Sequence, residues 1–194
     1  MPGSPREEDP DFPLLERVRD SLEGDLRAFE ELVRRHQSRI VADCRHMTRD
    51  DLNSEDLAQE VFVKAFFAMK GFEGRSSFRQ WLQRIKVHHC LNHLKRRGSK
   101  PGTPIDDAAV EQHHELQVSP VAERRYEQLG ERERIAAVLN SMSTTLRVPL
   151  IMADMDELSF AEIASALGIG LSAAKMRVKR AREEFRRKYE GGEN

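Results

Sequence analysis

The sequence predicts an all-α protein of two small helical domains joined by a flexible linker, the C-terminal domain being a helix-turn-helix. Three observations support this prediction. Apolar residues recur at three- and four-residue spacing in two separate stretches of the 194-residue chain. Between these stretches lies a segment rich in proline, glycine and acidic residues. Only 39% of residues are hydrophobic and 34% are charged, which suits small helical bundles better than a large sheet sandwich.

Residues 1–21 are predicted to form a disordered N-terminal tail. Four prolines fall within the first 13 residues, and little apolar surface is available for burial before Phe12. The whole chain contains neither the run of about 18 apolar residues that a membrane span needs nor a secretory signal. We therefore expect a cytoplasmic protein that does not insert into membranes.

The first domain is predicted to span residues 22–98. Leu57, Val61 and Ala65 share one helical face, and Gly71 is placed to end that helix. A further helix begins near Phe78 and carries Trp81 on its apolar stripe, which favours a core role for this tryptophan over a stacking role. Residues 99–130 are predicted to be the linker.

The second domain is predicted to span residues 131–190. Pro149 falls beyond the first turn of a predicted helix, where proline kinks or restarts a helix, so we expect an irregularity there. The strongest local signals follow at Ser159-Phe160-Ala161-Glu162, which is a capping box, and at Gly168, which is placed to end the short helix. Ser172 is predicted to cap a second helix that is apolar on one side and basic on the other. This arrangement is typical of a helix-turn-helix, and the alternative is a plain helical hairpin within a bundle, which has the same two packed helices.

Basic residues are concentrated in two segments. Residues 75–100 contain eight lysines and arginines and no Asp or Glu, and residues 175–188 contain eight more beside two glutamates. Acidic residues lie elsewhere, so the net charge of the chain is only -1. Two separate basic faces indicate two contacts with a polyanion, most simply a nucleic acid, while two solvated helix faces are the plainer alternative.

Three blocks of sequence together resemble one known family. They are AFEELVRRH (28–36), DLNSEDLAQEVFVKAFFAMKGFEGRSSFRQWLQRIKVHHCLNHLKRR (51–97) and LSFAEIASALGIGLSAAKMRVKRARE (158–183). In this order, and with the linker between the last two, they resemble bacterial RNA polymerase sigma factors of the extracytoplasmic-function (ECF) group of the sigma-70 family. The resemblance implies that the first domain is sigma region 2 and the second is sigma region 4.

For the first domain, the resemblance implies binding to core polymerase and recognition and melting of the promoter minus-ten element. The implied polymerase-binding residues are Asp56, Gln59, Glu60, Val63 and Lys64. Unpaired bases are held by stacking, by hydrogen bonds to base edges and by a basic groove. The implied contacts with the minus-ten element are Arg75, Ser76, Ser77, Arg79, Gln80, Arg84, Lys86, Val87, His88, Asn92, Lys95 and Arg96. His88 replaces the asparagine of many relatives, so the captured base is not predicted.

For the second domain, the resemblance implies recognition of the minus-thirty-five element through the helix-turn-helix. The implied contacts are Ser172, Ala173, Lys175, Met176, Arg177, Lys179, Arg180 and Arg182. Lys175 and Arg177 are candidates for guanine contacts, while Lys179, Arg180 and Arg182 are candidates for phosphate contacts. Met176 departs from the small polar residue common in relatives, so the upstream sequence is not predicted either.

The resemblance also implies the partners. They are core RNA polymerase, at its beta-prime clamp and beta flap regions, promoter DNA in duplex and single-stranded form, and an anti-sigma factor. It implies a cytoplasmic, nucleoid-associated protein. No cofactor and no catalytic activity are expected, because no phosphate-binding glycine loop, nucleophile elbow or paired-carboxylate site occurs in the sequence.

Two alternatives remain at this stage. His89 and His93, with His88 and Cys90 adjacent, have the spacing of a metal-ligand pair on a helix, but no further ligand lies at a recognisable spacing. A helix-turn-helix transcriptional regulator with an N-terminal helical sensor domain would also explain the second domain. Such a sensor domain has no evident need for the acid-free basic segment at residues 75–100.

Overall fold

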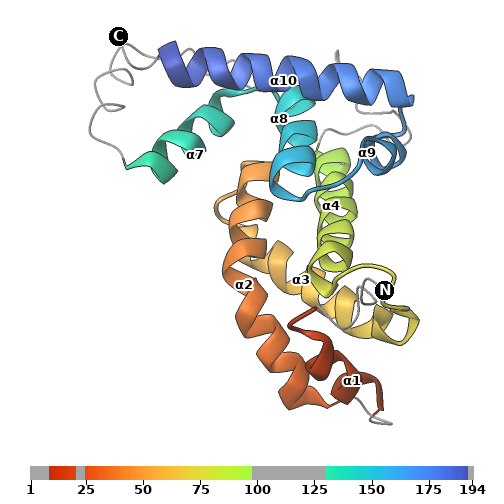
Figure 1. The fold of residues 1–194 in the computed structure, drawn as a ribbon. Coiled ribbons are helices and arrows are strands. Elements are labelled where there is room, and N and C mark those ends of the chain that lie inside the picture. Colours follow the sequence, from red (N-terminus) through yellow and green to blue (C-terminus); the bar gives the residue numbers. More distant parts are fainter. Residues whose placement is uncertain (1–8, 21–24, 98–129, 192–194) are drawn as a thin grey trace. The chain divides into compact units, whose positions relative to one another are not determined.

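The computed structural model describes residues 9–20, 25–97 and 130–191, and among these residues it contains helices and no β-strand (Figure 1). The chain divides into two compact units, Met1–Asn92 and His93–Asn194. The prediction of an all-α protein with two helical domains is therefore confirmed. No helix in the described ranges is long and apolar enough to cross a membrane.

The first unit begins with α1 (Phe12–Asp20), whose Leu15 and Val18 are buried. The predicted tail is therefore wrong for residues 9–20, because two apolar residues three positions apart give this segment a face to bury. Residues 1–8 and 21 of that prediction lie outside the described residues. Next comes α2 (Leu26–Thr48), where the Asp25 carboxylate accepts a hydrogen bond from the Ala28 N–H at 3.1 Å and caps the helix.

Two further helices complete the first unit. Helix α3 (Ser54–Ala68) packs against α2 and ends in a short 3-10 turn, η1 (Met69–Gly71). Its buried face includes Leu57, Val61 and Ala65, as the sequence predicts. Helix α4 (Phe78–Arg97) follows a loop at residues 73–77. Phe78 is fully buried, whereas Trp81 is half-buried and its ring lies 5.1 Å from that of Phe72, so Trp81 belongs to the edge of the core.

The second unit begins with α7 (Glu131–Ser141) and α8 (Thr144–Leu150). The predicted linker lies outside the described residues except for Gly130, whose N–H donates to Glu133 at 3.1 Å. Helix α8 passes into a π-helical turn, η2 (Ile151–Met155), two residues after Pro149. Proline cannot donate the backbone hydrogen bond that a regular helix needs at this point, so the predicted irregularity is confirmed.

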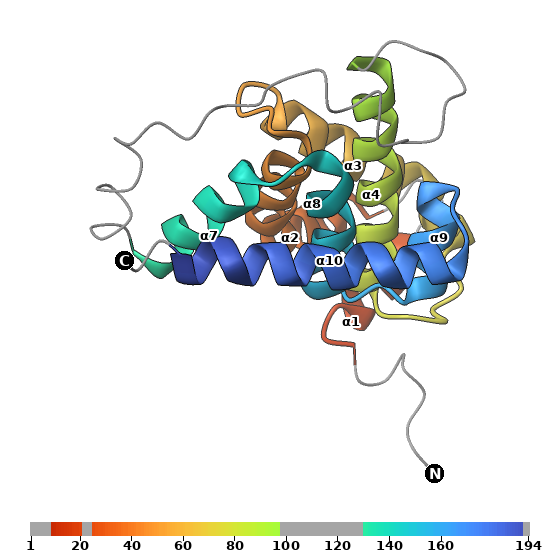
Figure 2. The ribbon, with the colours of Figure 1, turned by 90° about the horizontal axis from the view of Figure 1, so that it is seen from above.

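The last two helices of the second unit are α9 (Phe160–Leu167) and α10 (Leu171–Gly191). Helix α10 packs along α7, α8 and α9, and the two views show it as the longest straight element of this unit (Figure 2). Ala174, Val178 and Ala181 are buried, which leaves the opposite side of α10 exposed. The helix begins at Leu171, two residues earlier than a Ser172 cap predicts, so Ser172 lies within its first turn instead of capping it.

Candidate nucleic-acid interfaces

The outer face of α3 consists of Asp56, Gln59, Glu60, Val63 and Lys64, which are all exposed. These side chains lie on α3 opposite its buried apolar stripe because residues three and four apart share a helical face. Val63 exposes 55% of its surface and Phe67, one turn farther on, exposes 77%. An exposed valine and phenylalanine beside carboxylates give this face the mixed apolar and acidic character of a protein-binding surface.

One residue of this face also contacts α4. The Glu60 Oε2 lies 3.0 Å from the His89 Nε2, and while Glu60 is mostly exposed, His89 is 4% exposed. The outer face of α3 is therefore connected to α4 through a side-chain contact as well as through the shared core. Substitutions at Glu60 act on both helices, a point that matters for the design of tests.

The loop at residues 73–77 is held against the start of α4. The Ser77 Oγ accepts a hydrogen bond from the Gln80 N–H at 3.2 Å, which caps the helix, and the Arg84 Nη1 donates to the Ser76 Oγ at 3.0 Å. Gly74 has a φ of 68°, a left-handed conformation that favours glycine, and Arg75 forms an ion pair with Glu73. The predicted loop residues thus meet the first turns of α4.

Most predicted minus-ten contacts on α4 are accessible. Arg79, Gln80 and Arg84 are half-buried near the start of the helix. The exposed positions farther along are His88, Asn92, Lys95 and Arg96. Together with the loop at residues 73–77 they form a polar and basic surface that can donate hydrogen bonds to bases and neutralise phosphates.

Two predicted contacts, Lys86 and Val87, are wrong, because both side chains are buried. The Lys86 Nζ lies 3.2 Å from the Asp43 Oδ2 on α2, and the Gln83 Nε2 donates to the same oxygen at 3.2 Å. A buried ammonium is tolerated when a carboxylate compensates its charge. Lys86 therefore holds α4 to α2 and is not available to DNA.

The histidines of α4 are divided between core and surface, and its one cysteine is buried. His88 is exposed and His89 is buried, while Cys90 lies in the core with its Sγ 3.6 Å from the Cys44 Sγ. The hydrogen bond between the two thiols, together with burial, raises the pKa of Cys44. No group of three or more potential ligands of a metal gathers among the described residues.

Helices α9 and α10 have the geometry of a helix-turn-helix. The Ser159 Oγ accepts from the Glu162 N–H at 3.3 Å while the Glu162 Oε2 accepts from the Ser159 N–H at 2.9 Å, so the predicted capping box is confirmed. Gly168 ends α9 with a φ of 68°. Among the predicted upstream contacts, Arg177 is half-buried and the others are exposed: Ser172, Ala173, Lys175, Met176, Lys179, Arg180 and Arg182.

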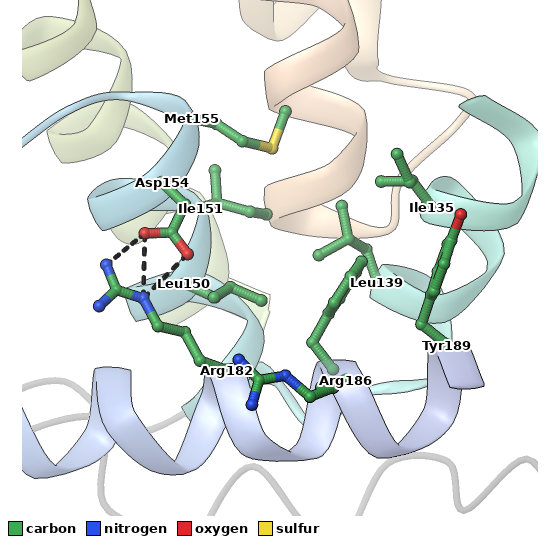
Figure 3. A pocket seen from close by; sticks show the side chains of 10 residues that line it. Ile135, Leu139, Leu150, Ile151, Asp154, Met155, Arg182, Arg186 and Tyr189 are labelled. Carbon is green, nitrogen blue, oxygen red and sulfur yellow. Dashed lines mark hydrogen bonds and ion pairs between the residues drawn. The ribbon is translucent and has the colours of Figure 1, made fainter. Parts of the chain in front are cut away.

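Arg182 has a partner within the second unit. Its guanidinium donates to both oxygens of Asp154 in η2, with an Nη2–Oδ1 distance of 2.5 Å, and this hydrogen bond raises the pKa of Arg182 (Figure 3). Of the three arginines and lysines predicted to contact phosphates, Arg182 has the closer carboxylate partner, while the Lys179 Nζ lies 3.9 Å from the Glu183 Oε1.

Beside this ion pair lies an apolar groove of about 470 Å³ between α7, α8, η2 and α10. Figure 3 shows Ile135 and Leu139 of α7 facing Ile151 and Met155 across it, with Tyr189 of α10 at one end. Arg182 and Arg186 lie along the α10 side. The groove has the form of a site for an apolar helix or side chain, with basic residues at its rim.

Comparison with known protein families matches both units. Residues 32–100 match the model of sigma-70 region 2, and residues 132–185 match the model of sigma-70 region 4. The RNA polymerase sigma-H factor of Pseudomonas aeruginosa is 32% identical over 177 residues, which cover 89% of this chain and 90% of that protein. The chain belongs to the sigma-70 family.

Further relatives place it in the ECF group of this family. The ECF RNA polymerase sigma-E factor of Escherichia coli K12 is 30% identical over 182 residues, covering 91% of this chain and 93% of the relative. Two solved structures share the fold. CnrH in complex with the cytosolic domain of CnrY has a TM-score of 0.56 and 24% identity, and the match covers 91% of this chain and 95% of that one. The Bartonella quintana sigma factor RpoE in complex with the anti-sigma factor NepR has a TM-score of 0.57 and 21% identity, and the match covers 84% of this chain and 96% of that one.

Sequence reasoning missed several residues of this ECF sigma factor that support its surfaces. Asp43 and Asp154 pair with predicted DNA contacts, and Phe67 extends the outer face of α3. The spacing of Phe67 from Val63, four positions on the same helix, could have identified it. No local pattern marks Asp43 or Asp154, because their partners lie 43 and 28 positions away in the sequence.

Proposed function

We propose that this ECF sigma factor binds core RNA polymerase and directs it to promoters, where it starts transcription. The observation that supports this most strongly is that one chain contains both sigma regions, each with an exposed surface of the required chemistry. Region 2 presents an acidic and apolar face on α3 and a basic face on α4, while region 4 presents the basic side of α10.

In this proposal, the outer face of α3 docks on the beta-prime clamp region of the polymerase. Asp56 and Glu60 contribute charge complementarity toward basic groups on the partner, which guides association, and Val63 contributes apolar area. Docking places α4 and the loop at residues 73–77 beside the minus-ten element. These residues bind unpaired bases and so stabilise the open strand, without making or breaking a covalent bond.

The second unit reads the minus-thirty-five element in duplex form. The first turns of α10 enter the major groove, where Lys175 and Arg177 donate to base edges. Lys179 and Arg180, which follow on the exposed part of the helix, contact phosphates and fix the register. Both units thus act on DNA in the cytoplasm, at the nucleoid.

The apolar groove of the second unit is proposed to bind the beta flap region of the polymerase. Ile135→Asp is expected to weaken binding of the protein to core polymerase, because a carboxylate would be desolvated in a groove lined by apolar side chains. Binding to duplex DNA with a minus-thirty-five element should remain unchanged. Fluorescence anisotropy with labelled core polymerase and with labelled duplex separates the two effects. Equal loss in both assays would contradict this assignment.

An anti-sigma factor is the second class of protein partner that we propose. It would compete with core polymerase for the same exposed surfaces, because a partner that covers the outer face of α3 blocks docking. This proposal is supported by family membership and by the structure of the relative RpoE, which is in complex with the anti-sigma factor NepR.

Transcription with purified components tests the main proposal. Core polymerase with the protein should start transcripts at specific promoters, and start sites mapped after overproduction of the protein should share two sequence elements. A helix-turn-helix regulator would instead bind a palindromic duplex as a dimer and leave the promoter specificity of the polymerase unchanged. That second outcome would reject the sigma function.

A further inference from the structure

The first turn of α4 is capped by a residue from the far N-terminal part of the chain. The Phe78 N–H donates to the Asp9 Oδ2 at 2.6 Å, across 69 positions of sequence. Ser77 caps the same turn locally, through the Gln80 N–H. Helix N-termini carry unsatisfied N–H groups and a partial positive charge, so an aspartate carboxylate is well suited to this place.

Asp9 is itself held in position. Its Oδ1 accepts a hydrogen bond from the Asp11 N–H at 3.0 Å, and Asp11 is bound to α2. The Asp11 carboxylate lies 3.1 Å from the Arg35 Nη1 and 2.6 Å from the His36 Nε2. The His36 ring in turn packs edge-on against the Phe78 ring, with centroids 5.4 Å apart. The segment before α1 thus ties the start of α4 to α2.

This tie is located at the functional surface. Phe78 directly follows the loop at residues 73–77, and its backbone sets where that loop ends. Arg84 reaches back to Ser76, so the loop has a second attachment to α4, one that involves side chains only. Within the helix start, the Trp81 N–H donates to the Ser77 carbonyl oxygen at 3.1 Å, and Asp9 adds a bond to the Phe78 N–H from outside α4. A loop that must present hydrogen-bonding groups to an extruded base performs better when it is already ordered before the base arrives.

We propose that Asp9 is a positioning residue for promoter opening, which fixes the start of α4 and the adjoining loop in the arrangement that captures unpaired bases. The proposal rests on the function proposed above. It assigns no DNA contact to Asp9, because this side chain is 9% exposed. Its effect on DNA passes through the Phe78 backbone.

The test compares three variants of the full-length protein assembled with core polymerase. Asp9→Ala removes the cap, and it should slow promoter opening about tenfold, the effect expected when one hydrogen bond to a charged group is lost at that step. Asp9→Asn keeps an oxygen acceptor and should restore most of the rate. Asp25→Ala is the matched control, since the Asp25 carboxylate also accepts a hydrogen bond from a backbone N–H in the first turn of a helix, α2. Opening is followed by the fluorescence of 2-aminopurine in the minus-ten element.

Two additional measurements separate positioning from general destabilisation. Asp9→Ala and Asp25→Ala should lower the melting temperature to a similar degree and leave the affinity for core polymerase unchanged. Hydrogen exchange of the amides in residues 73–81 should become faster in Asp9→Ala and not in Asp25→Ala. An Asp25→Ala holoenzyme that opens as slowly as Asp9→Ala would overturn the proposal, and so would an Asn variant as slow as the Ala variant.

Failure of the proposed sigma function and failure of the proposed role of Asp9 give different results in the opening assay. A wild-type holoenzyme that opens no promoter would reject the proposed function and the role of Asp9 with it. A wild-type holoenzyme that opens promoters at the same rate as Asp9→Ala would reject the role of Asp9 alone.

Discussion

Lys86 shows how a single residue that looks like a DNA contact in the sequence serves the core instead. Its side chain is fully buried, and its Nζ lies 3.2 Å from the Asp43 Oδ2, which also accepts from Gln83. Desolvation of both charges offsets much of their attraction, so the pair adds little net stability compared with an apolar pair of the same shape. Removal of one partner is different, because it leaves the other charge buried and uncompensated.

Asp43→Ala is therefore expected to lower the free energy of unfolding of the first unit by about 3–5 kcal/mol. Trp81 is the only tryptophan of the chain and lies in this unit, so its fluorescence during urea unfolding reports on the first unit. Glu31→Ala is the matched control, since Glu31 pairs with Arg34 and Arg35 at the surface, where solvent screens an ion pair and its loss costs little stability. Equal changes in the two variants would show that the Lys86 charge is compensated in another way.

Asp11 makes the stability of the first unit depend on pH. Burial alone would raise its pKa, but the hydrogen bond from His36 and the ion pair with Arg35 outweigh burial and lower the pKa below the ordinary value of 3.8. A carboxyl group with a lowered pKa in the folded state stabilises the fold above its ordinary pKa, and this contribution is lost as the pH falls through the lowered pKa.

Asp11→Asn should therefore reduce stability at neutral pH and make the acid side of the stability curve less steep below about pH 4. Urea unfolding followed through Trp81 at a series of pH values measures both effects. Wild-type and variant curves that run parallel below pH 4 would show that Asp11 does not titrate in the folding reaction.

At the scale of the helices, local signals predicted well and distant contacts were missed. The start and end of α9 follow from signals within ten consecutive residues, the Ser159 capping box and Gly168, and the structure confirms both. The sequence predicts a disordered tail over the residues of α1 because three prolines precede this helix and a fourth, Pro13, lies in its first turn. The contacts that order this segment, from Asp9 to Phe78 and from Asp11 to His36, span 69 and 25 positions of sequence. Hydrophobic periodicity carries no information about such partners.

The same limit applies to the candidate site. The exposed basic side of α10 follows from periodicity alone, because Ala174, Val178 and Ala181 mark the buried side. The burial of Lys86 cannot be predicted from periodicity, because a lysine is almost never fully buried unless a distant residue pairs with it. The sequence therefore predicts which helices carry the surfaces, while the structure decides which basic side chains reach them.

The turn between α9 and α10 allows a matched test with two glycines. Gly168 has a φ of 68°, whereas Gly170 has no such constraint, and nothing lies within 4 Å of a Cβ added at either position. Gly168→Ala should cost about 1 kcal/mol from the left-handed backbone alone. Gly170→Ala should cost less. Hydrogen exchange of the α9 and α10 amides measures the difference, and equal protection in both variants would contradict the role of the left-handed turn.

At the scale of the whole molecule, the two units are proposed to divide the work of one initiation event. In this proposal, the outer face of α3 decides whether polymerase is bound at all, and α10 decides which duplex is chosen. A surface that only contacts polymerase should affect every promoter alike, whereas a base-reading side chain should affect only promoters that contain its element. The two classes of variant can therefore be told apart without knowledge of the promoter sequence.

Gln59→Ala combined with Val63→Ala is expected to weaken binding to core polymerase about tenfold, because exposed residues at the centre of a docking face dominate its affinity. Glu60 is left unchanged in this variant because it also contacts His89 on α4.

Lys175→Ala should leave polymerase affinity intact and weaken binding of the holoenzyme to upstream-element duplex by about 1–3 kcal/mol.

Leu26→Ala provides the control for loss of exposed apolar surface, since Leu26 is 61% exposed and lies on α2, outside the α3 residues of the docking face. Its affinity for core polymerase should equal that of the wild type. The division of work requires that the Gln59 and Val63 variant lose transcription in equal proportion on promoters with and without an upstream element. It also requires that Lys175→Ala lose transcription only where the element is present. If both variants gave the same promoter-dependent pattern, the outer face of α3 would belong to DNA recognition and not to docking.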